Sequence, residues 1–457
     1  MRHCFHRGFL MDSKWVKLFP PFVRQHLEGR IYLQNVLNNI GWLFSEKIFQ
    51  LIAGLFIGVW LARYLRPDQF GTLSYAIAFV ALVSPIAGLG LDGIVVRDLV
   101  RASSDKESLL GTAFGLKLAG GIAGLAISVA LILLLRPGDD LALWLVGILA
   151  TGLVFQAFDV IRFWFESQVQ SKYVVYARNV AFCAIAAVKV GLILAEAPLI
   201  AFAWAGALEI IASAIGFSVA YKVTGHRIRS WRWDRGLAEK LIRESWPLLL
   251  SGFAVLTYMK IDIVMLGSMI GDRSVGIYSA ATRLSEVWYF IPLAIVSSVS
   301  PSIVEAKKTG EGLYYERIGK LFRLMAGISY GIAIFMTMFS DFLVLTLFGP
   351  AYLEAGVVLS IHIWASVFVF LGVARGPWIL NEGLMKLSLY SAILGATINI
   401  LLNVLLIPRL GPAGAAIATL LSYSFSAFFF NALLRTTRRI FSMQLCALLF
   451  IPMVKHK

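Results

Sequence analysis

The chain has 457 residues, of which 59% are hydrophobic and only 15% are charged. Soluble domains carry about 25% charged residues, so the composition excludes an ordinary soluble protein and indicates a membrane protein built of α-helices. The formal net charge of +15 does not indicate a nucleic-acid partner, because no basic stretch with interleaved aromatic residues occurs on a soluble module.

The chain begins with a basic segment, which we expect to be cytoplasmic and to cover residues 1–37. Its first 30 residues mix six Lys and Arg residues with aromatic residues, and they contain no apolar core followed by a signal-peptide cleavage site. This pattern is typical of an amphipathic segment at the membrane interface. An unstructured leader, with Met11 as the start, is the alternative.

Twelve apolar runs follow, and each is close to the 20 or so residues that a membrane-spanning helix needs. Their limits are 38–62, 70–94, 108–135, 141–165, 174–195, 199–221, 246–270, 276–302, 319–340, 355–374, 387–407 and 412–434. Because the loops between them are short, no soluble domain fits there, and the chemistry takes place in or at the membrane.

We expect the twelve spans to form two pseudo-symmetric lobes of six helices around a central cavity. Residues 38–223 would be the N-lobe and residues 246–434 the C-lobe, joined by a basic cytoplasmic linker at 224–245. The tail at 435–457 would be cytoplasmic or interfacial. Its apolar run at 440–454 is short for a span, and a thirteenth crossing there is the less favoured alternative.

Basic residues alternate between successive loops. Of the 41 Lys and Arg residues, 29 fall on one side of the predicted spans, including Arg375 and Lys386 in one loop, and five fall on the opposite side. The positive-inside rule places the basic side, and with it both termini, in the cytoplasm. A mistaken span would scramble this alternation, so the asymmetry also supports the number of spans.

A weak internal repeat supports two halves of equal topology. A Gly-x-x-Ser-x-Ala motif opens the second span at Gly71 and the eighth span at Gly276, 205 residues later. Parallel repeats are related by an axis along the membrane normal, and a two-lobed bundle of this kind is typical of transporters that work by alternating access.

Seven basic residues lie inside the predicted spans. They are Lys47, Lys117, Arg162, Arg178, Lys189, Lys260 and Arg283. A charge at the bilayer centre costs about 2.5–3.5 kcal/mol on insertion scales, so this many are expected only around a water-filled, polar interior. We therefore predict a cationic cavity that holds an anion, namely the head group of a lipid.

Six of these residues are the predicted substrate-binding cations. The main candidates for anion contacts are Lys47, Lys117, Lys260 and Arg283, and the further candidates are Arg162 and Lys189. The alternative for each of them is a buried ion pair with a purely structural role.

Carboxylates in the same spans are expected to form ion pairs or to carry a coupling proton. They are Asp159, Glu209, Asp262 and Glu286. Asp159 shares a helical face with Arg162 and Glu166, which favours a self-neutralised stripe near the cytoplasmic end.

Arg283 has two expected partners. It pairs either with Glu286 on its own helix or with Asp262 across a helix contact, and the second pairing would leave Lys260 free toward the cavity. Asn399 and Asn403, which lie four residues apart, are interpreted first as interhelical hydrogen-bonding residues and second as sugar contacts.

Several stretches resemble a known family. They run from Asp262 to Leu284, from Phe348 to Ala355 and from Asn399 through Pro408 to Thr419, and Phe163-Trp-Phe-Glu166 at the end of span 4 is also similar. With them the chain resembles, over about residues 35–435, the polysaccharide-biosynthesis (Wzx-type) oligosaccharide flippases of bacterial inner membranes. The superfamily of these flippases also contains multidrug/cation antiporters and lipid II flippases.

The resemblance implies a multi-pass protein of the bacterial inner membrane that moves undecaprenyl-diphosphate-linked oligosaccharides, the repeat units of O-antigen or exopolysaccharide, to the periplasmic leaflet. The cationic cavity would shield the diphosphate and the glycan while the isoprenoid tail stays in lipid. Implied partners are this glycan lipid, membrane lipids, and polysaccharide polymerase or assembly proteins. No ligand residue is carried over, because the cavity charges of the family vary in position.

Three other functions remain open. A multidrug or cation antiporter shares the fold but would favour acids in its cavity, and a lipid II flippase would often have extra spans. A membrane-embedded polysaccharide polymerase or glycosyltransferase would need a sizeable outward loop or an acidic nucleotide-sugar motif, and the sequence has neither. We expect no enzyme, no cofactor and no metal site, since Cys4, Cys183 and Cys446 lack ligand spacing.

Overall fold

A computed structural model describes residues 31–101 and 105–451, and all regular structure in these ranges is helical. The predicted interfacial segment within residues 1–30 lies outside them. The helices of the first half are α2 (Ile31–Gly88), α3 (Asp92–Arg101), α4 (Lys106–Leu135), α5 (Asp140–Phe155), η3 (Gln156–Phe158), α6 (Asp159–Ser167), α7 (Lys172–Leu194) and α8 (Leu199–Val223).

The connection and the second half are also helical. They consist of η4 (Ile228–Ser230), α9 (Arg235–Met269), α10 (Asp272–Glu286), η5 (Val287–Tyr289), α11 (Phe290–Thr309), α12 (Glu311–Met338), α13 (Ser340–Phe348), η6 (Pro350–Tyr352), α14 (Ala355–His362), α15 (Ala365–Asn381), α16 (Met385–Ser424), the π-helical turn η7 (Phe425–Phe429), α17 (Phe430–Leu433) and α18 (Arg438–Leu448).

Ten helical segments of the described chain are long and apolar enough to cross a membrane, and the protein is an all-α, multi-pass membrane protein. Two of the ten, Glu46–Arg101 with 56 residues and Met385–Leu433 with 49, are long enough for two crossings each. The backbone breaks within them at Arg66 (φ 59°) in α2 and at Gly411 (φ 57°) in α16. A proline follows each break, and proline lacks the N–H that a continuous helix needs. Each break falls in a gap between two of the predicted apolar runs.

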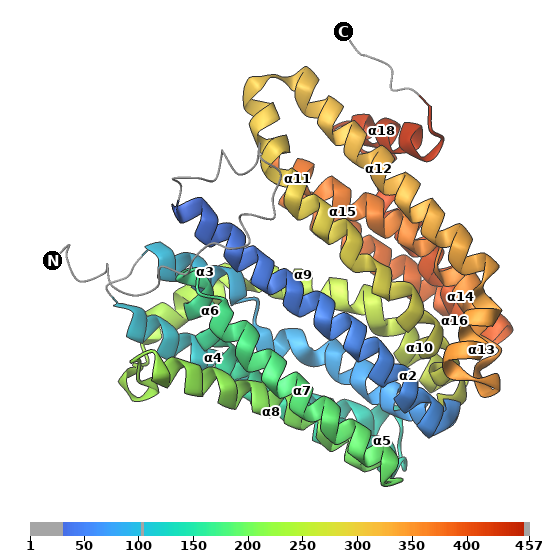
Figure 1. Cartoon of the computed structure of the whole chain (residues 1–457), viewed down its shortest axis with the longest axis horizontal. Coiled ribbons are helices and arrows are strands. Elements are labelled where there is room, and N and C mark those ends of the chain that lie inside the picture. Colours follow the sequence, from blue (N-terminus) through green and yellow to red (C-terminus); the bar gives the residue numbers. More distant parts are fainter. Residues whose placement is uncertain (1–30, 102–104, 452–457) are drawn as a thin grey trace.

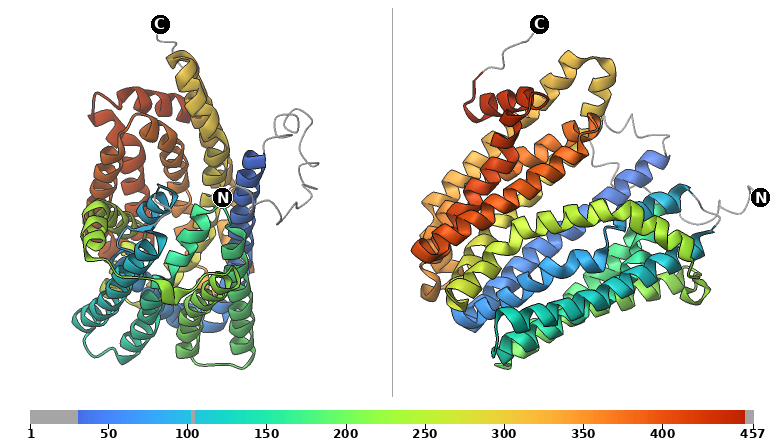
Figure 2. Two further views of the ribbon diagram at one scale, coloured as in Figure 1. Left: turned by 90° about the vertical axis from the view of Figure 1, so that its left-hand side faces the viewer. Right: turned by 180° about the vertical axis from the view of Figure 1, so that it is seen from behind.

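The helices form two groups that meet at one end of the molecule (Figure 1). One group contains α4, α5, α7 and α8, the other contains α12, α15 and α16, and α2, α9 and α10 lie between them. α2 packs against both α9 and α10. The groups separate toward the end that carries α3 and the loop between α11 and α12 (Figure 2).

The second helix of α2 and the helix α10 meet through a pair of glycines. A Cβ atom on Gly71 would overlap the carbonyl oxygen of Asp272, and a Cβ atom on Gly276 would overlap the carbonyl oxygen of Pro67. Both pairs of partners are offset by the same 205 residues as the sequence motif. The two copies of the motif therefore make the same contact with each other, as a local two-fold axis requires.

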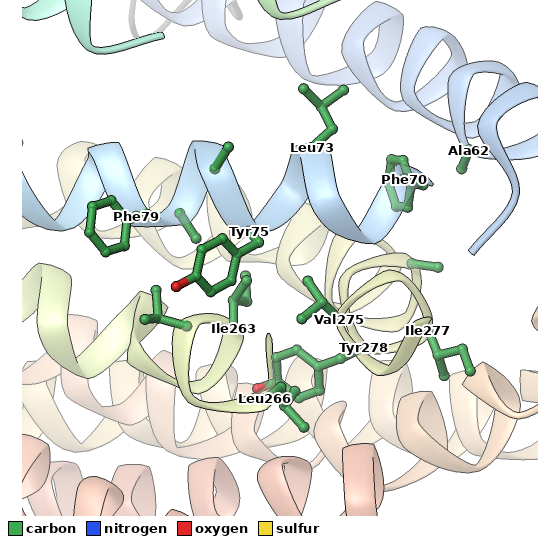
Figure 3. Close-up of a cluster of buried hydrophobic side chains, with 14 of the residues drawn as sticks. Ala62, Phe70, Leu73, Tyr75, Phe79, Ile263, Leu266, Val275, Ile277 and Tyr278 are labelled. Atoms are coloured by element: carbon green, nitrogen blue, oxygen red, sulfur yellow. The ribbon is translucent and has the colours of Figure 1, made fainter. Parts of the chain in front are cut away.

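The largest apolar cluster lies around this contact (Figure 3). Phe70 and Tyr75 of α2 are buried together with Leu266 of α9 and with Val275 and Tyr278 of α10. Lipid tails are as apolar as these side chains, so close packing rather than water exclusion holds such a contact together inside a bilayer. The cluster fixes the position of the residues of α2 and α10 that follow the glycines.

α9 connects the two halves. It begins at Arg235, inside the expected linker 224–245, and a carboxylate oxygen of Asp234 caps its first turn by accepting from the Leu237 N–H at 2.8 Å. Leu241 near the start of α9 is buried in the core of the first half, whereas Leu266 near its end belongs to the central cluster. One helix thus contacts both groups.

The C-terminal tail folds back as the short helix α18, which packs against α12. Its 11 residues rise about 16 Å, roughly half of the hydrocarbon thickness of a bilayer. Ile440 and Ala447 are fully buried. α18, in the described part of the run 440–454, is therefore shorter than a membrane crossing.

The prediction that Arg375 lies in a loop is wrong. We expected it beside Lys386 on the basic side, but it lies in α15 with 5% of its surface exposed. Its guanidinium donates to Asn431 Oδ1 at 2.5 Å and to Ser391 Oγ at 3.3 Å. The sequence suggested a loop because glycine and proline follow Arg375, but the helix continues through Pro377 to Asn381.

Candidate functional site

Three adjacent hollows with volumes of about 400, 790 and 440 Å³ lie along α2. The first adjoins α9 and α10, the largest reaches α7, α8 and α11, and the third is enclosed by α5, α7 and α8 of the first half. They share walls, since Glu286 lines the first and the largest and Glu209 lines the largest and the third. Arg283 lines the first and the third. Together these hollows are called the interlobe cavity.

Charges of both signs line the interlobe cavity. The basic residues are Lys47, Arg178, Lys189, Lys260 and Arg283. The acidic residues are Glu46, Asp159, Glu209 and Glu286. The sequence predicts a cationic cavity, whereas the formal charge of this lining is nearly balanced. The sequence shows which residues are charged, but it does not show which acids fold against the cations.

Lys260 on α9 pairs with Glu286 on α10, with an Nζ–Oε2 distance of 3.1 Å. About a quarter of each side chain is exposed, so the pair is accessible from the cavity. The two partners expected for Arg283, Glu286 and Asp262, were both wrong. Glu286 forms its ion pair with Lys260, and Asp262 lies in a separate polar network. Lys260 is therefore not the free cation that the second pairing would have produced.

Two further cations of the cavity wall are paired across helices. Lys189 on α7 contacts Glu209 on α8 with an Nζ–Oε2 distance of 2.8 Å. Arg178 on α7 contacts Glu46 on α2 at 3.7 Å. In the sequence Glu46 is a direct neighbour of Lys47, but its carboxylate is 3% exposed and faces α7. Only the packing of α2 on α7 shows this role.

Lys117 and Arg162 lie away from the three hollows and share one carboxylate. The distances to the oxygens of Asp92 are 3.5 Å from Lys117 Nζ and 3.2 Å from Arg162 Nη2. Arg162 also contacts Glu166 at 2.9 Å and Asp159 at 4.0 Å, which matches the self-neutralised stripe. Their positions favour the structural alternative for both predicted cations.

Lys47 and Arg283 are the two predicted cations that line the cavity without a carboxylate contact within 4.0 Å in the described ranges. Lys47 is exposed in the largest hollow, next in sequence to Glu46. The guanidinium of Arg283 lies 5.3 Å from the centre of the Phe70 ring, an attraction between a cation and an aromatic face. Arg283 is only partly exposed, so its charge is held at the meeting point of two hollows.

Asp262 is buried outside the cavity in a network that joins three helices. It accepts from Tyr278 on α10 at 2.8 Å, from Asn403 on α16 at 2.5 Å, and from the hydroxyl of Thr419. Asn403 also donates to Asn399 at 3.1 Å. The first interpretation of the two asparagines, as interhelical hydrogen-bonding residues, is confirmed. Tyr278 and Thr419 were not predicted as partners of Asp262, because both helices carry several hydroxyl side chains and the sequence does not show which of them face the carboxylate.

The end where the helix groups meet is closed by contacts between the halves, which we call the seal. Asp272 accepts from Arg136 at 2.6 Å and from Thr72 at 2.7 Å. The Tyr352 hydroxyl donates to the Ala62 carbonyl at 2.8 Å. Arg63 donates to two carbonyls at the end of α13. The cavity is therefore separated from this end of the molecule.

Comparisons with known proteins place these features in context. The model of a family described as "Polysaccharide biosynthesis protein" matches residues 60–357. A probable flippase of Haloferax volcanii, AglR, is 32% identical over 178 residues, or 36% of each chain. A probable low-salt glycan biosynthesis flippase of the same organism, Agl15, is 27% identical over 196 residues, or 41% of this chain and 40% of that protein. The chain thus spans well under half the length of these relatives.

Solved structures share the fold over most of the chain. An inward-facing multidrug resistance MATE family transporter of the MOP superfamily matches with a TM-score of 0.71 over 86% of this chain and 95% of that one. The lipid II flippase MurJ, in an inward closed conformation, matches with a TM-score of 0.70 over 89% and 91%. Both are 15% identical to this chain, so the likeness concerns the fold alone.

Proposed function

This chain belongs to the polysaccharide biosynthesis protein family, as its sequence motifs suggest, and on that premise we propose that it is a flippase for lipid-linked oligosaccharides. The relatives with a named activity are flippases and transporters, not enzymes. The finer proposal is that it moves undecaprenyl-diphosphate-linked repeat units of O-antigen or exopolysaccharide in a bacterial inner membrane. That part is supported by the sequence resemblance, whereas the curated flippase relatives are archaeal.

The single observation that carries the proposal is the position of Arg283. Its guanidinium lies in the cavity between the halves and has no carboxylate within ion-pair distance in the described ranges. A charge held in a membrane interior needs a counter-charge or water, and arginine matches the oxygens of a phosphate with two parallel hydrogen bonds. A diphosphate head group would supply the missing anion.

We propose that the structure is the inward-facing state of a protein with twelve crossings and both termini in the cytoplasm. The seal lies at the end that carries few basic residues, such as Arg63 and Arg136, and the helix groups separate at the strongly basic end. The positive-inside rule makes the basic end cytoplasmic. In support, the TM-score is 0.71 with an inward-facing MATE structure and 0.62 with an outward-facing one.

The proposal is tested in cells that depend on this chain to export their surface glycan. Arg283→Ala should lower surface glycan about tenfold or more, since a hydrogen bond to a charged group contributes roughly 1.5–3 kcal/mol. Lys260→Ala should lower it less, because Lys260 is already paired. Lys320→Ala is the control, since Lys320 pairs on the surface with Glu316 at 2.7 Å. Wild-type glycan in the Arg283→Ala, Lys260→Ala and double variants, with the protein present in the membrane, would reject the anion role.

The lipid that accumulates identifies the substrate. If the finer proposal holds, Arg283→Ala cells should retain undecaprenyl-diphosphate oligosaccharide with its glycan on the cytoplasmic leaflet, as measured by protection from an external glycosidase. Accumulation of lipid II instead would favour the lipid II flippase, whose structural likeness is nearly as high as that of the MATE transporter.

A cation or drug antiporter is the second candidate, and the mixed lining of the cavity favours it. Asp159, Glu209 and Glu286 face the largest hollow, and carboxylates attract cations. Glu209→Gln should then abolish ethidium efflux from a strain that lacks its own pumps, and Arg283→Ala should not. Efflux equal to that of the empty vector would dismiss this candidate.

Among the expected coupling acids, we propose Asp262 as the carboxylate that takes up a proton. Glu209 and Glu286 each contact a lysine, and Asp159 lies near Arg162, whereas Asp262 is 2% exposed and accepts only from neutral groups. Asp262→Asn should abolish transport driven by a proton gradient in proteoliposomes but leave substrate-binding affinity within about twofold. A wild-type response to the gradient in Asp262→Asn would contradict the assignment.

A further inference from the structure

The side chain of Arg283 crosses from one half of the molecule to the other. Its backbone belongs to α10 of the second half, and its guanidinium lies against Gly58 in the first helix of α2 and near the ring of Phe70. A Cβ atom built on Gly58 would overlap the Nη1 atom of Arg283. The missing side chain of Gly58 therefore makes the space that the cation occupies.

Gly58 differs from Gly71 and Gly276 in what a Cβ atom would contact. At Gly71 and Gly276 a Cβ atom would meet backbone atoms of the opposite helix, which cannot move without shifting the helix. At Gly58 it would meet the tip of a flexible side chain. Gly54, one turn earlier on the same helix, has nothing within 4 Å of its Cβ position. An alanine at position 58 should therefore displace the guanidinium without disturbing the fold.

The location of the guanidinium gives this contact a functional meaning. Arg283 lines both the hollow between α2 and α10 and the hollow inside the first half, and it is the charged residue that these two hollows share. A guanidinium recognises phosphate through a fixed fork of N–H groups, and a displacement of about 1 Å can cost up to 100-fold in a positioned interaction. Its place against Gly58 therefore determines whether two parallel hydrogen bonds to a phosphate can form.

We propose that Gly58 is a positioning residue that holds Arg283 where it binds the diphosphate of the substrate. The inference rests on the proposed function, because it assumes that the ligand of Arg283 is a polyprenyl diphosphate. It adds a residue of the first half to an anion site whose charge comes from the second half. The affinity for the head group then depends on contact between α10 and the first helix of α2, whose end carries the seal residues Ala62 and Arg63.

A double-mutant cycle on the purified full chain tests the proposal, with farnesyl diphosphate as the soluble probe in isothermal titration. Arg283→Ala should weaken binding about tenfold or more, and Gly58→Ala should weaken it by a similar factor. The double variant Gly58→Ala/Arg283→Ala should bind no more weakly than Arg283→Ala, because both changes remove one interaction. Gly88→Ala is the control, because a Cβ atom at Gly88 at the end of α2 meets nothing within 4 Å and Gly88 lines none of the three hollows; it should bind like the wild type.

The outcomes separate the inference from the proposed function. Unchanged or tighter binding by Gly58→Ala, or losses that multiply in the double variant, would overturn the positioning role while leaving the anion role of Arg283 intact. Wild-type binding by Arg283→Ala would overturn the proposed anion role itself. If Gly58→Ala were unstable, restoration of its melting temperature by Arg283→Ala would support the contact, and failure of that restoration would overturn it.

Discussion

The helix that starts after Arg66 and the helix that starts after Gly271 begin with the same local structure. Both starts have a residue with positive φ, 59° at Arg66 and 101° at Gly271, followed by a glycine that packs on the opposite helix start. Two turns further on they differ. The second half has Arg283 and Glu286 in the cavity wall, where the first half, 205 residues earlier, has alanines.

This difference separates packing from chemistry. The local symmetry comes from small residues, which allow two helices to approach closely in a membrane where hydrophobic burial contributes little. The charges break the symmetry and occur in one copy only. A head group bound at Arg283 would therefore contact the halves unequally, which a transporter needs if its ligand is to favour one arrangement of the lobes over another.

Changing Gly71 or Gly276 should have the largest effect, because each glycine packs directly on backbone atoms where the two halves meet. Gly71→Ala and Gly276→Ala each place a methyl group against a backbone carbonyl, and overpacking of this kind costs about 1–3 kcal/mol. Since the two contacts are related by the local two-fold axis, the two variants should lower the thermal unfolding midpoint by similar amounts. Gly54→Ala, which meets nothing within 4 Å, is the control, and losses that differ strongly between Gly71→Ala and Gly276→Ala would disprove the equivalence of the two copies.

Much of the fold could be predicted from the sequence, because apolar run length is set by bilayer thickness. The twelve runs fall on the helices, and the breaks at Arg66 and Gly411 lie in gaps between runs. The beginning of α9 at Arg235 was missed, since Asp234 caps a helix in a stretch whose charges suggested a loop. Arg375 was placed in a loop for a similar reason, because the glycine and proline after it suggested the end of a helix.

The candidate site could be predicted only in part. The sequence shows that Lys189 and Lys260 lie inside spans. It does not show their partners, because Glu209 lies 20 residues from Lys189 and Glu286 lies 26 residues from Lys260, each on another helix. Which pairs form depends on the rotation of one helix against another, and no local pattern encodes that angle. Arg283 and Lys47 are distinguished as cations without a carboxylate partner in the described ranges only after the other cavity cations have been paired with their acids.

The seal should respond more weakly than the glycine contacts. Asp272→Asn keeps an oxygen that accepts from Thr72 but removes the charge opposite Arg136, whose Nη2 lies 2.6 Å away. The loss of about 1 kcal/mol should shift the population about fivefold toward the outward-open state. A single cysteine at Ser279 in the cavity wall, in a chain with Cys4, Cys183 and Cys446 replaced by serine, should then react faster with an impermeant thiol reagent added from outside.

The matched control for this experiment is Arg273→Gln, because Arg273 contacts Glu354 on the exposed surface of the same end at 3.4 Å. Exposed pairs contribute little, so Arg273→Gln should leave the labelling rate within about twofold of the parent. Equal labelling of Asp272→Asn and the parent chain would show that the seal does not depend on the charge of Asp272.

The smallest expected effect concerns Glu286, the acidic residue near Arg283 that has no counterpart in the first half. Glu286→Gln removes the carboxylate that holds Lys260 at 3.1 Å, so the cavity gains one uncompensated cation, and Lys260→Gln leaves one uncompensated acid. Because both side chains are about a quarter exposed, water screens much of the change, and the affinity for farnesyl diphosphate should change only about threefold in each case. The signs should be opposite, with tighter binding in Glu286→Gln and weaker binding in Lys260→Gln. Changes of the same sign would mean that the pair acts through the fold rather than through its charge, and Arg283 would then be the only cation of this wall that the substrate senses.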